Sequence, residues 1–170
     1  MSQYQDGLNQ SELDYQQKLR EAQEDAVGNI LSDGLELINY IEVVENTSWF
    51  AREMRDKIIH PDSPKIACKA KCHWCCHQSV SVSAPEVFRI TEFLKINKQE
   101  EKYISKLETL SAKTKGKSTK QRALVEMPCA FLAYGECQIY DVRPLFCQRQ
   151  TSYSLSDCKK AKLKGFPVGS

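Results

Sequence analysis

The chain has 170 residues and a formal net charge of only +2, so its length fits one domain with a short extension and allows a hydrophobic core. Its first ten residues are polar, and no stretch approaches the roughly 18 consecutive apolar residues that indicate a membrane span. The sequence therefore predicts neither a secretory signal nor a membrane helix. We expect a soluble, cytoplasmic protein with no membrane partner.

The charge is spread unevenly along the chain. Residues 1–67 hold 6 Lys/Arg and 13 Asp/Glu, whereas residues 68–170 hold 18 and 9, together with all 8 cysteines. In a reducing compartment such a cluster of cysteines indicates metal binding before it indicates disulfides. Thiolates around a divalent ion leave negative charge, which neighbouring Lys and Arg side chains would offset. The excess of positive charge in residues 68–170 therefore does not by itself indicate that the protein binds nucleic acid.

The chain is predicted to divide into an N-terminal helical segment, 1–60, and a cysteine-cluster domain, 61–170. His60-Pro61 and Pro64 mark the connection, because a proline disfavours helix in the residue before it. We expect the helical segment to pack on the cysteine domain. The alternative is that it docks a protein partner.

Apolar residues recur every three or four positions through the N-terminal segment, which is typical of amphipathic helices. Gly28 and Gly34 interrupt the pattern, and each costs about 1 kcal/mol relative to alanine in a helix interior. We therefore expect separate helices over 11–27 and 30–44. The Asn-Thr-Ser sequence at 46–48 supplies cap residues for a third helix.

The part between the two cysteine blocks is predicted to be helical scaffold. Polar and apolar residues alternate over 79–82, which suits a short strand, and a capping box at 83–86 begins a helix over 84–96. A second helix is expected over 98–112, with Asn97 as its cap. The first of these helices is expected to bury Val87, Ile90, Phe93 and Leu94, and the second to carry Tyr103, Leu107 and Leu110 on one face.

Residues 113–122 hold five cations and no aromatic residue. Such a segment could neutralise phosphates, but single-strand binding normally also needs stacking side chains. We interpret it as a surface loop and expect no nucleic-acid partner.

The first cysteine block places four thiols and two imidazoles within residues 68–77, with the spacing C-x3-C-x2-C-C. These short gaps suit a metal, because the chain can turn back and aim several sulfurs at one point. Cys75 and Cys76 are adjacent, and neighbouring side chains diverge by about 100° in a helix and 180° in a strand. We therefore expect two metal positions or a cluster of several metals. His73 and His77 flank the thiols, and either could replace a cysteine as ligand.

The second block contains Cys129, Cys137, Cys147 and Cys158, separated by 7, 9 and 10 residues. These gaps are too wide for a simple knuckle, so the four thiols must converge through tertiary folding. Arg143-Pro144 predicts a rigid turn before Cys147, and the guanidinium could donate to a thiolate. The aromatic residues Tyr140 and Phe131 either cover the site or pack in the core.

The two blocks together resemble the YkgJ-type cysteine-cluster family, which is described as zinc- or iron-chelating. The resemblance covers roughly residues 66–160 and rests on C-x3-C-x2-C-C, P-C-x-F-L and G-x-C-x-I-Y-x2-R-P-x2-C. A related cluster in flagellin lysine methylases is associated with an iron–sulfur centre, but this chain is too short to carry such an enzyme whole. The resemblance implies metal ligation by Cys68, Cys72, Cys75, Cys76, Cys129, Cys137 and Cys147, with Cys158 matching a frequent downstream cysteine.

We therefore predict a mostly α protein with short irregular β segments, organised by metal bound to its eight cysteines. Zinc and iron, including an iron–sulfur cluster, both suit all-thiolate sites. Two other classes stay open: a redox or group-transfer enzyme component, and a zinc-dependent module that binds protein or nucleic acid. No phosphate loop, acid pair or nucleophile–base arrangement points to a specific reaction.

Overall fold

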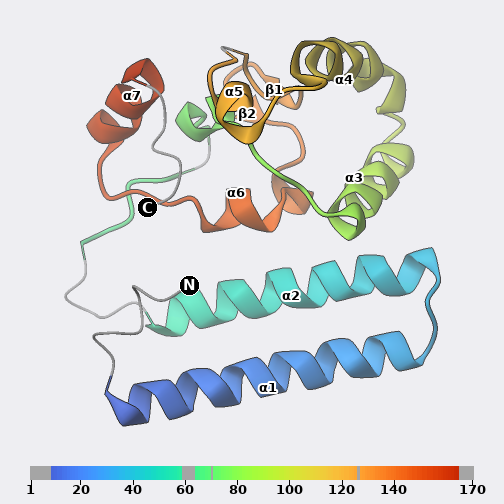
Figure 1. Cartoon of the computed structure of the whole chain (residues 1–170), viewed down its shortest axis with the longest axis vertical. Coiled ribbons are helices and arrows are strands. Elements are labelled where there is room, and N and C mark those ends of the chain that lie inside the picture. The colour runs from blue at the N-terminus through green and yellow to red at the C-terminus, as the bar shows by residue number, and fades with distance from the viewer. Residues whose placement is uncertain (1–8, 59–63, 70, 126, 165–170) are drawn as a thin grey trace. The chain divides into compact units, whose positions relative to one another are not determined.

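The computed structural model describes residues 9–58, 64–69, 71–125 and 127–164 (Figure 1). The chain forms two compact units, Met1–Ile59 and His60–Ser170. Helices dominate both, and the one sheet of the described ranges has two strands, which confirms the mostly α fold class. Within these ranges no helix combines the length and the hydropathy needed to cross a membrane.

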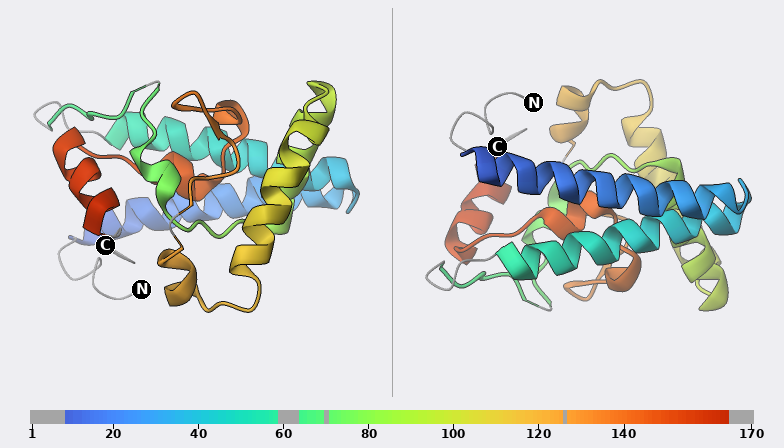
Figure 2. Two further views of the ribbon diagram at one scale, coloured as in Figure 1. Left: turned by 90° about the horizontal axis from the view of Figure 1, so that it is seen from above. Right: turned by 90° about the horizontal axis from the view of Figure 1, so that it is seen from below.

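The first unit is an antiparallel hairpin of α1 (Gln10–Ser32) and α2 (Leu37–Ile58), which lie side by side in Figures 1 and 2. Asn9 caps α1 in a reciprocal capping box with Glu12. The turn between the helices uses Gly34, whose φ of +149° suits glycine. Asn39 closes this turn: its Oδ1 accepts from the Glu36 amide at 3.2 Å, and its Nδ2 donates to the Ile30 carbonyl at 3.3 Å.

The expected division of this unit into three helices is wrong. Gly28 lies inside α1, where the cost of one glycine is smaller than the gain from packing a continuous helix along α2. The residues expected to cap a third helix lie in the interior of α2 instead. Gln23 Nε2 donates to Asn46 Oδ1 and to Thr47 Oγ1, both at 3.2 Å, and Ser48 is buried. The hydrogen bonds of Gln23 join the two helices, so tertiary contact outweighs the local cap signal.

The second unit has a small core between α3 (Ala84–Ile96) and α4 (Glu100–Thr114). Ile90, Leu94, Tyr103 and Ile139 are buried together. Partly buried side chains packed against them are Phe93, Phe131, Cys137 and Val142. The expectation for Val87 is wrong, because it is 43% exposed; the inward face of α3 is formed by residues 86, 90 and 94, four positions apart.

The capping box of Ser83 and Glu86 is confirmed, and Glu86 does more than cap. Its Oε2 accepts from the Ser83 amide at 2.7 Å, while its Oε1 accepts from the Leu145 amide at 2.8 Å. The carboxylate thereby joins the start of α3 to the start of α6 (Leu145–Arg149), the helix that carries Cys147. The side chain is buried at 7% exposure.

Three local expectations differ from the structure. Residues 79–82 form no strand. Asn97 ends α3, with its Nδ2 donating to the Phe93 carbonyl at 2.8 Å, and does not begin α4. The expected loop over 113–122 contains the end of α4 and a short helix, α5 (Thr119–Ala123), because Ser118 and Gln121 form a capping box. In the second and third cases, side-chain caps decide where the helices begin and end.

The remaining elements are short and surround the cysteines. They are η1 (Trp74–His77), β1 (Leu132–Ala133), β2 (Glu136–Cys137), η2 (Tyr140–Val142) and α7 (Leu155–Lys164). β1 and β2 pair antiparallel, with Leu132 opposite Cys137. Tyr134 and Gly135 between them have φ of +53° and +74°, which is typical of a primed two-residue hairpin turn.

Candidate metal centre

All eight cysteines are described, all are half-buried, and none forms a disulfide. They come from six places in the second unit. Cys68 and Cys72 precede η1, Cys75 and Cys76 lie within it, and Cys129 precedes β1. The others are Cys137 at the end of β2, Cys147 in α6 and Cys158 in α7.

The loop from Cys68 to Cys76 turns sharply. The Cys72 amide donates to the Lys69 carbonyl at 3.1 Å, and the Cys76 amide donates to the His73 carbonyl at 3.0 Å. Lys71 has a left-handed φ of +68°, a conformation that costs free energy for any residue with a Cβ. Its ammonium lies 3.0 Å from the Glu136 carboxylate, so an ion pair to β2 accompanies the strained position.

Cys75 and Cys76 are adjacent in η1, and the interaction between their thiols lowers the pKa of Cys75 and raises that of Cys76. The Cys76 carbonyl also accepts from the Cys129 amide at 2.7 Å, so the second block meets the first at this pair. The expectation that the two sulfurs serve different metal positions stays a prediction.

After burial, neighbouring thiols raise the pKa values of several cysteines. The pKa of Cys68 is raised by Cys72, Cys158 and Cys75, and the pKa of Cys147 is raised by Cys129, Cys75 and Cys137. We call Cys68, Cys72 and Cys158 the first group of thiols, and Cys76, Cys129, Cys137 and Cys147 the second group.

Burial and the neighbouring thiols raise the pKa values of the second group. Burial raises the pKa of Cys129 and of Cys137, and it raises the pKa of Cys147 to about 12. Arg143 acts in the opposite direction on Cys137 and Cys147, and its guanidinium lies 4.1 Å from the ring centre of Tyr140. This guanidinium is therefore placed near the sulfurs to offset their charge.

The Ser152 amide donates to Cys68 Sγ at 3.2 Å. Burial raises the pKa of Cys129 and of Cys137, and backbone hydrogen bonds from Phe131 and Ile139 act in the opposite direction. A neutral thiol is a weak acceptor, whereas a thiolate gains from each such donor. These donors therefore favour the thiolate form, but burial outweighs them and the pKa values of the three thiols are raised overall.

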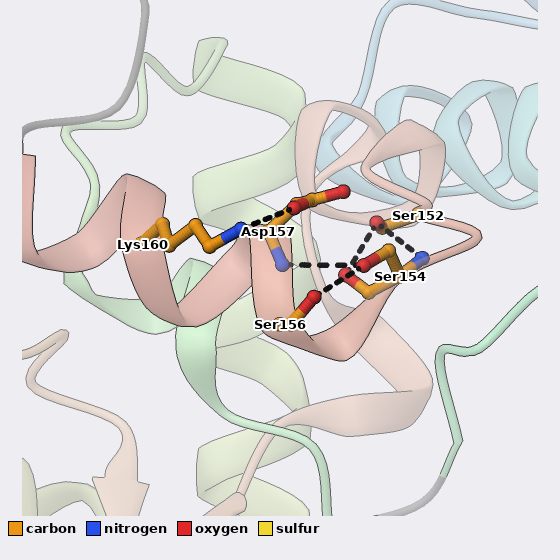
Figure 3. Close-up of polar contacts among 5 residues, drawn as sticks. All are labelled: Ser152, Ser154, Ser156, Asp157 and Lys160. Carbon is orange, nitrogen blue, oxygen red and sulfur yellow. Dashed lines mark hydrogen bonds and ion pairs between the residues drawn. The ribbon is translucent and has the colours of Figure 1, made fainter.

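A serine-rich turn positions the last cysteine, Cys158 (Figure 3). Ser154 Oγ accepts from the Asp157 amide at 3.3 Å and lies 2.9 Å from Ser156 Oγ, so it caps the start of α7. Ser152 Oγ accepts from the Ser154 amide at 3.0 Å. The Ser152 backbone also contacts the Cys68 sulfur. The serine-rich turn therefore connects Cys68 with α7, the helix that carries Cys158.

The thiol donors fit a thiophilic metal such as zinc or iron by their chemistry. Among the described residues, no three His, Cys, Asp or Glu side chains lie close enough together to hold one ion. The fold brings the six cysteine-bearing segments to one region, but it does not by itself impose a coordination geometry.

Sequence reasoning missed two residues that support the cluster. Glu86 was expected only as a cap, yet it also anchors the helix of Cys147. Ser152 carries no motif and is identified only by its contact with Cys68 across 84 positions of sequence.

Comparison with known proteins returned one result. No match was found among curated proteins or among solved structures. Residues 67–164 match the CxxCxxCC family, whose description is "putative zinc- or iron-chelating domain". The matched range includes all eight cysteines and covers more than half of the chain. The chain therefore belongs to this family of cysteine-rich zinc- or iron-chelating domains.

Proposed function

We propose that the second unit is a metal-binding domain, in which zinc or iron is held by the thiolates of the two groups around Cys75. The ligands in this proposal are Cys68, Cys72, Cys75, Cys76, Cys129, Cys137, Cys147 and Cys158. The observation that carries the proposal is the set of eight half-buried cysteines, none of them in a disulfide, within the range that matches a family of zinc- or iron-chelating domains.

The size of the core supports the same proposal. Among the described residues of the second unit, the buried hydrophobic side chains are Ile90, Leu94, Tyr103, Ala130 and Ile139. A core of this size supplies little stability, and small domains of this kind commonly depend on a structural metal. Structural zinc contributes an apparent binding free energy of about 10–16 kcal/mol, comparable to the whole stability of a typical domain. We infer that the metal folds the domain of residues 61–170.

The number of cysteines favours a centre with more than one metal atom. A tetrahedral zinc ion accepts four ligands, and eight thiols exceed that number. Two zinc ions would take eight thiolates, or seven with one bridging sulfur, and a polynuclear iron–sulfur cluster is the alternative. An iron–sulfur cluster would add the capacity for electron transfer, and with it the role of a redox component.

Metal analysis of the whole chain, purified without oxygen, tests the proposal. We expect zinc or iron in a stoichiometric amount. Visible thiolate-to-iron absorption would identify iron, whereas a colourless metal-loaded protein would identify zinc. Cys129→Ser should lose metal. Leu124→Ser is the control, because this side chain is 80% exposed and lies outside the cluster.

A chain without zinc or iron, in both the purified and the reconstituted protein, would refute metal binding. Full metal content in Cys129→Ser would instead show that the cysteines of the first block bind the metal on their own.

A further inference from the structure

A stripe of exposed side chains runs along α2 of the hairpin. Its members recur every three or four positions, which places them on one side of the helix; they are Ile38, Glu42, Glu45, Trp49 and Arg52. All five are exposed, and Ile38 and Trp49 are 63% and 55% exposed. Tryptophan and arginine are among the residue types most enriched at the positions that dominate protein–protein binding. The composition of the stripe therefore indicates an interface.

The hairpin is also electrically polarised between its two ends. Residues 21–48, which form the turn end, hold seven acidic residues and no Lys or Arg. Residues 9–20 and 49–58, where α1 begins and α2 ends, hold five Lys or Arg and four acidic residues. All the basic residues of the described hairpin therefore lie at its open end, and most of the acidic residues lie at its turn end.

The order of charges along the stripe is complementary to itself in the antiparallel direction. Two acidic residues precede Trp49, and Arg52 follows it. A two-fold axis between residues 48 and 49 would place Glu45 opposite Arg52 of a second copy, and Arg52 opposite Glu45 of that copy. The two Trp49 rings would meet at the axis and bury each other's apolar surface. Such a two-fold interface uses the same surface on both copies.

The acidic excess of the turn end does not oppose this pairing. An α-helix rises 1.5 Å per residue, so Leu37 at the start of α2 would lie about 17 Å from the axis. The acidic turn end of the second copy would lie as far away on the other side. Exposed charges are largely screened beyond about 8 Å at physiological salt. Each acidic end would instead lie near the end of the other hairpin that carries the bases.

We propose that the stripe on α2 is a self-association surface, through which two copies of this chain pair with their α2 helices antiparallel. The occupant is a second copy because one stripe holds both the acids and the base that complement each other. A face built for a basic partner would carry acids alone. This surface lies in the hairpin and needs no metal, so it adds a function to the one proposed for the cysteine unit.

Analytical ultracentrifugation of the whole chain under reducing conditions, over a range of protein concentrations, tests the pairing. We expect a dimer that forms as the concentration rises. Glu45→Arg and Arg52→Glu should each raise the dissociation constant at least about tenfold, because each places like charges opposite each other at both ends of the interface. The double variant should restore the dimer, since it exchanges the two partners of each ion pair.

The double variant is a clean test of contact between copies. Residues 45 and 52 are seven positions apart, and side chains at this spacing do not pair within one helix. Trp49→Ser should weaken the dimer as strongly as either charge reversal, because it removes the apolar centre of the interface. Tyr15→Ser is the matched control: this aromatic side chain of α1 is 49% exposed and lies outside the stripe, so the dimer should be unchanged.

Three results would overturn the proposal. A chain that is monomeric at every concentration would leave the stripe to a partner of another kind. A dimer that neither charge reversal weakens would place the interface elsewhere. Single reversals that weaken the dimer without restoration in the double variant would show that Glu45 and Arg52 do not face each other across an axis.

Discussion

The α1–α2 hairpin and the cysteine unit, residues 60–170, differ in what holds each of them together. The hairpin consists of two long helices, in which nearly every backbone group is paired within its own helix. Ile41 and Val44 are buried on α2, and Gln23 bridges to the polar residues of that helix. The cysteine unit has short elements, irregular connections and contacts between residues far apart in sequence, such as Cys68 with Ser152.

This difference shows two ways of specifying a structure. Helices of more than 20 residues gain from propensity and from side-by-side packing, so no single residue decides the outcome. The cysteine unit depends on a few side chains whose partners lie in other segments. Changes there should have much larger effects than changes in the hairpin.

The largest effect is expected at Cys75. If Cys75 ligates metal together with thiols of both groups, Cys75→Ser should release metal from the whole centre and forfeit much of the about 10–16 kcal/mol that structural metal supplies. Cys72→Ser should retain the metal of the second group. Metal-to-protein ratios measure the difference, and equal losses in the two variants would show that Cys75 is not shared.

A smaller effect is expected at Glu86. Replacement by Gln removes a buried carboxylate that accepts from the Ser83 and Leu145 amides, and should lower the free energy of unfolding by about 1–3 kcal/mol at neutral pH. Burial alone would raise the pKa of Glu86, but the hydrogen bonds from Ser83 and Leu145 lower it overall.

The sign of the pH dependence follows from that lowered pKa. The stabilisation is complete above the unfolded pKa and is lost as the pH falls through the folded pKa. Urea unfolding of both proteins from neutral to acidic pH should show the deficit of Glu86→Gln narrowing. A deficit that is constant over this range would mean that the charge of Glu86 does not contribute.

In the hairpin, two glycines form a matched pair with opposite expectations. Gly28→Ala should raise stability by up to about 1 kcal/mol, because Gly28 lies within α1 and no atom lies within 4 Å of the added Cβ. Gly34→Ala should lower stability, since φ is +149° and the new Cβ would lie 3.3 Å from Asn39 Oδ1. A melting temperature that is lower for Gly28→Ala than for Gly34→Ala would contradict the hairpin geometry.

The smallest effect is expected for the lysines of residues 113–122. Their side chains are exposed, so replacement of Lys113, Lys115, Lys117 or Lys120 by Ser should change stability by no more than about 0.5 kcal/mol. We also expect no salt-dependent binding of single-stranded nucleic acid, because the segment lacks stacking residues. Tight binding of single-stranded nucleic acid that is weakened by these replacements would show that the segment is a nucleic-acid interface.

The parts of the fold that were predicted correctly depend on local signals. The helix over 84–96 and its capping box at Ser83 and Glu86 follow from periodicity and one short motif, and the structure has the same bounds. The family was recognisable because the spacing of the cysteines is itself a local pattern. Local signals failed at Gly28 and at residues 46–48, where contact between α1 and α2 overrides them.

The arrangement of the site depends on contacts that the sequence does not display. Nothing near Ser152 marks it as a partner of Cys68, and nothing near Leu145 marks its amide as a partner of Glu86. The hydrogen bond from the Cys129 amide to the Cys76 carbonyl, which joins the two cysteine blocks, likewise has no mark in the sequence. The identity of the cysteines was therefore predictable, but their grouping was not.

Amide hydrogen exchange on the whole chain, measured before and after a chelator removes the metal, tests whether metal holds the cysteine unit folded. We expect protection across residues 68–160, including α3 and α4, to collapse when the metal is removed, whereas α1 and α2 keep theirs. Unchanged protection of α3 and α4 in the metal-free protein would show that metal does not fold this unit.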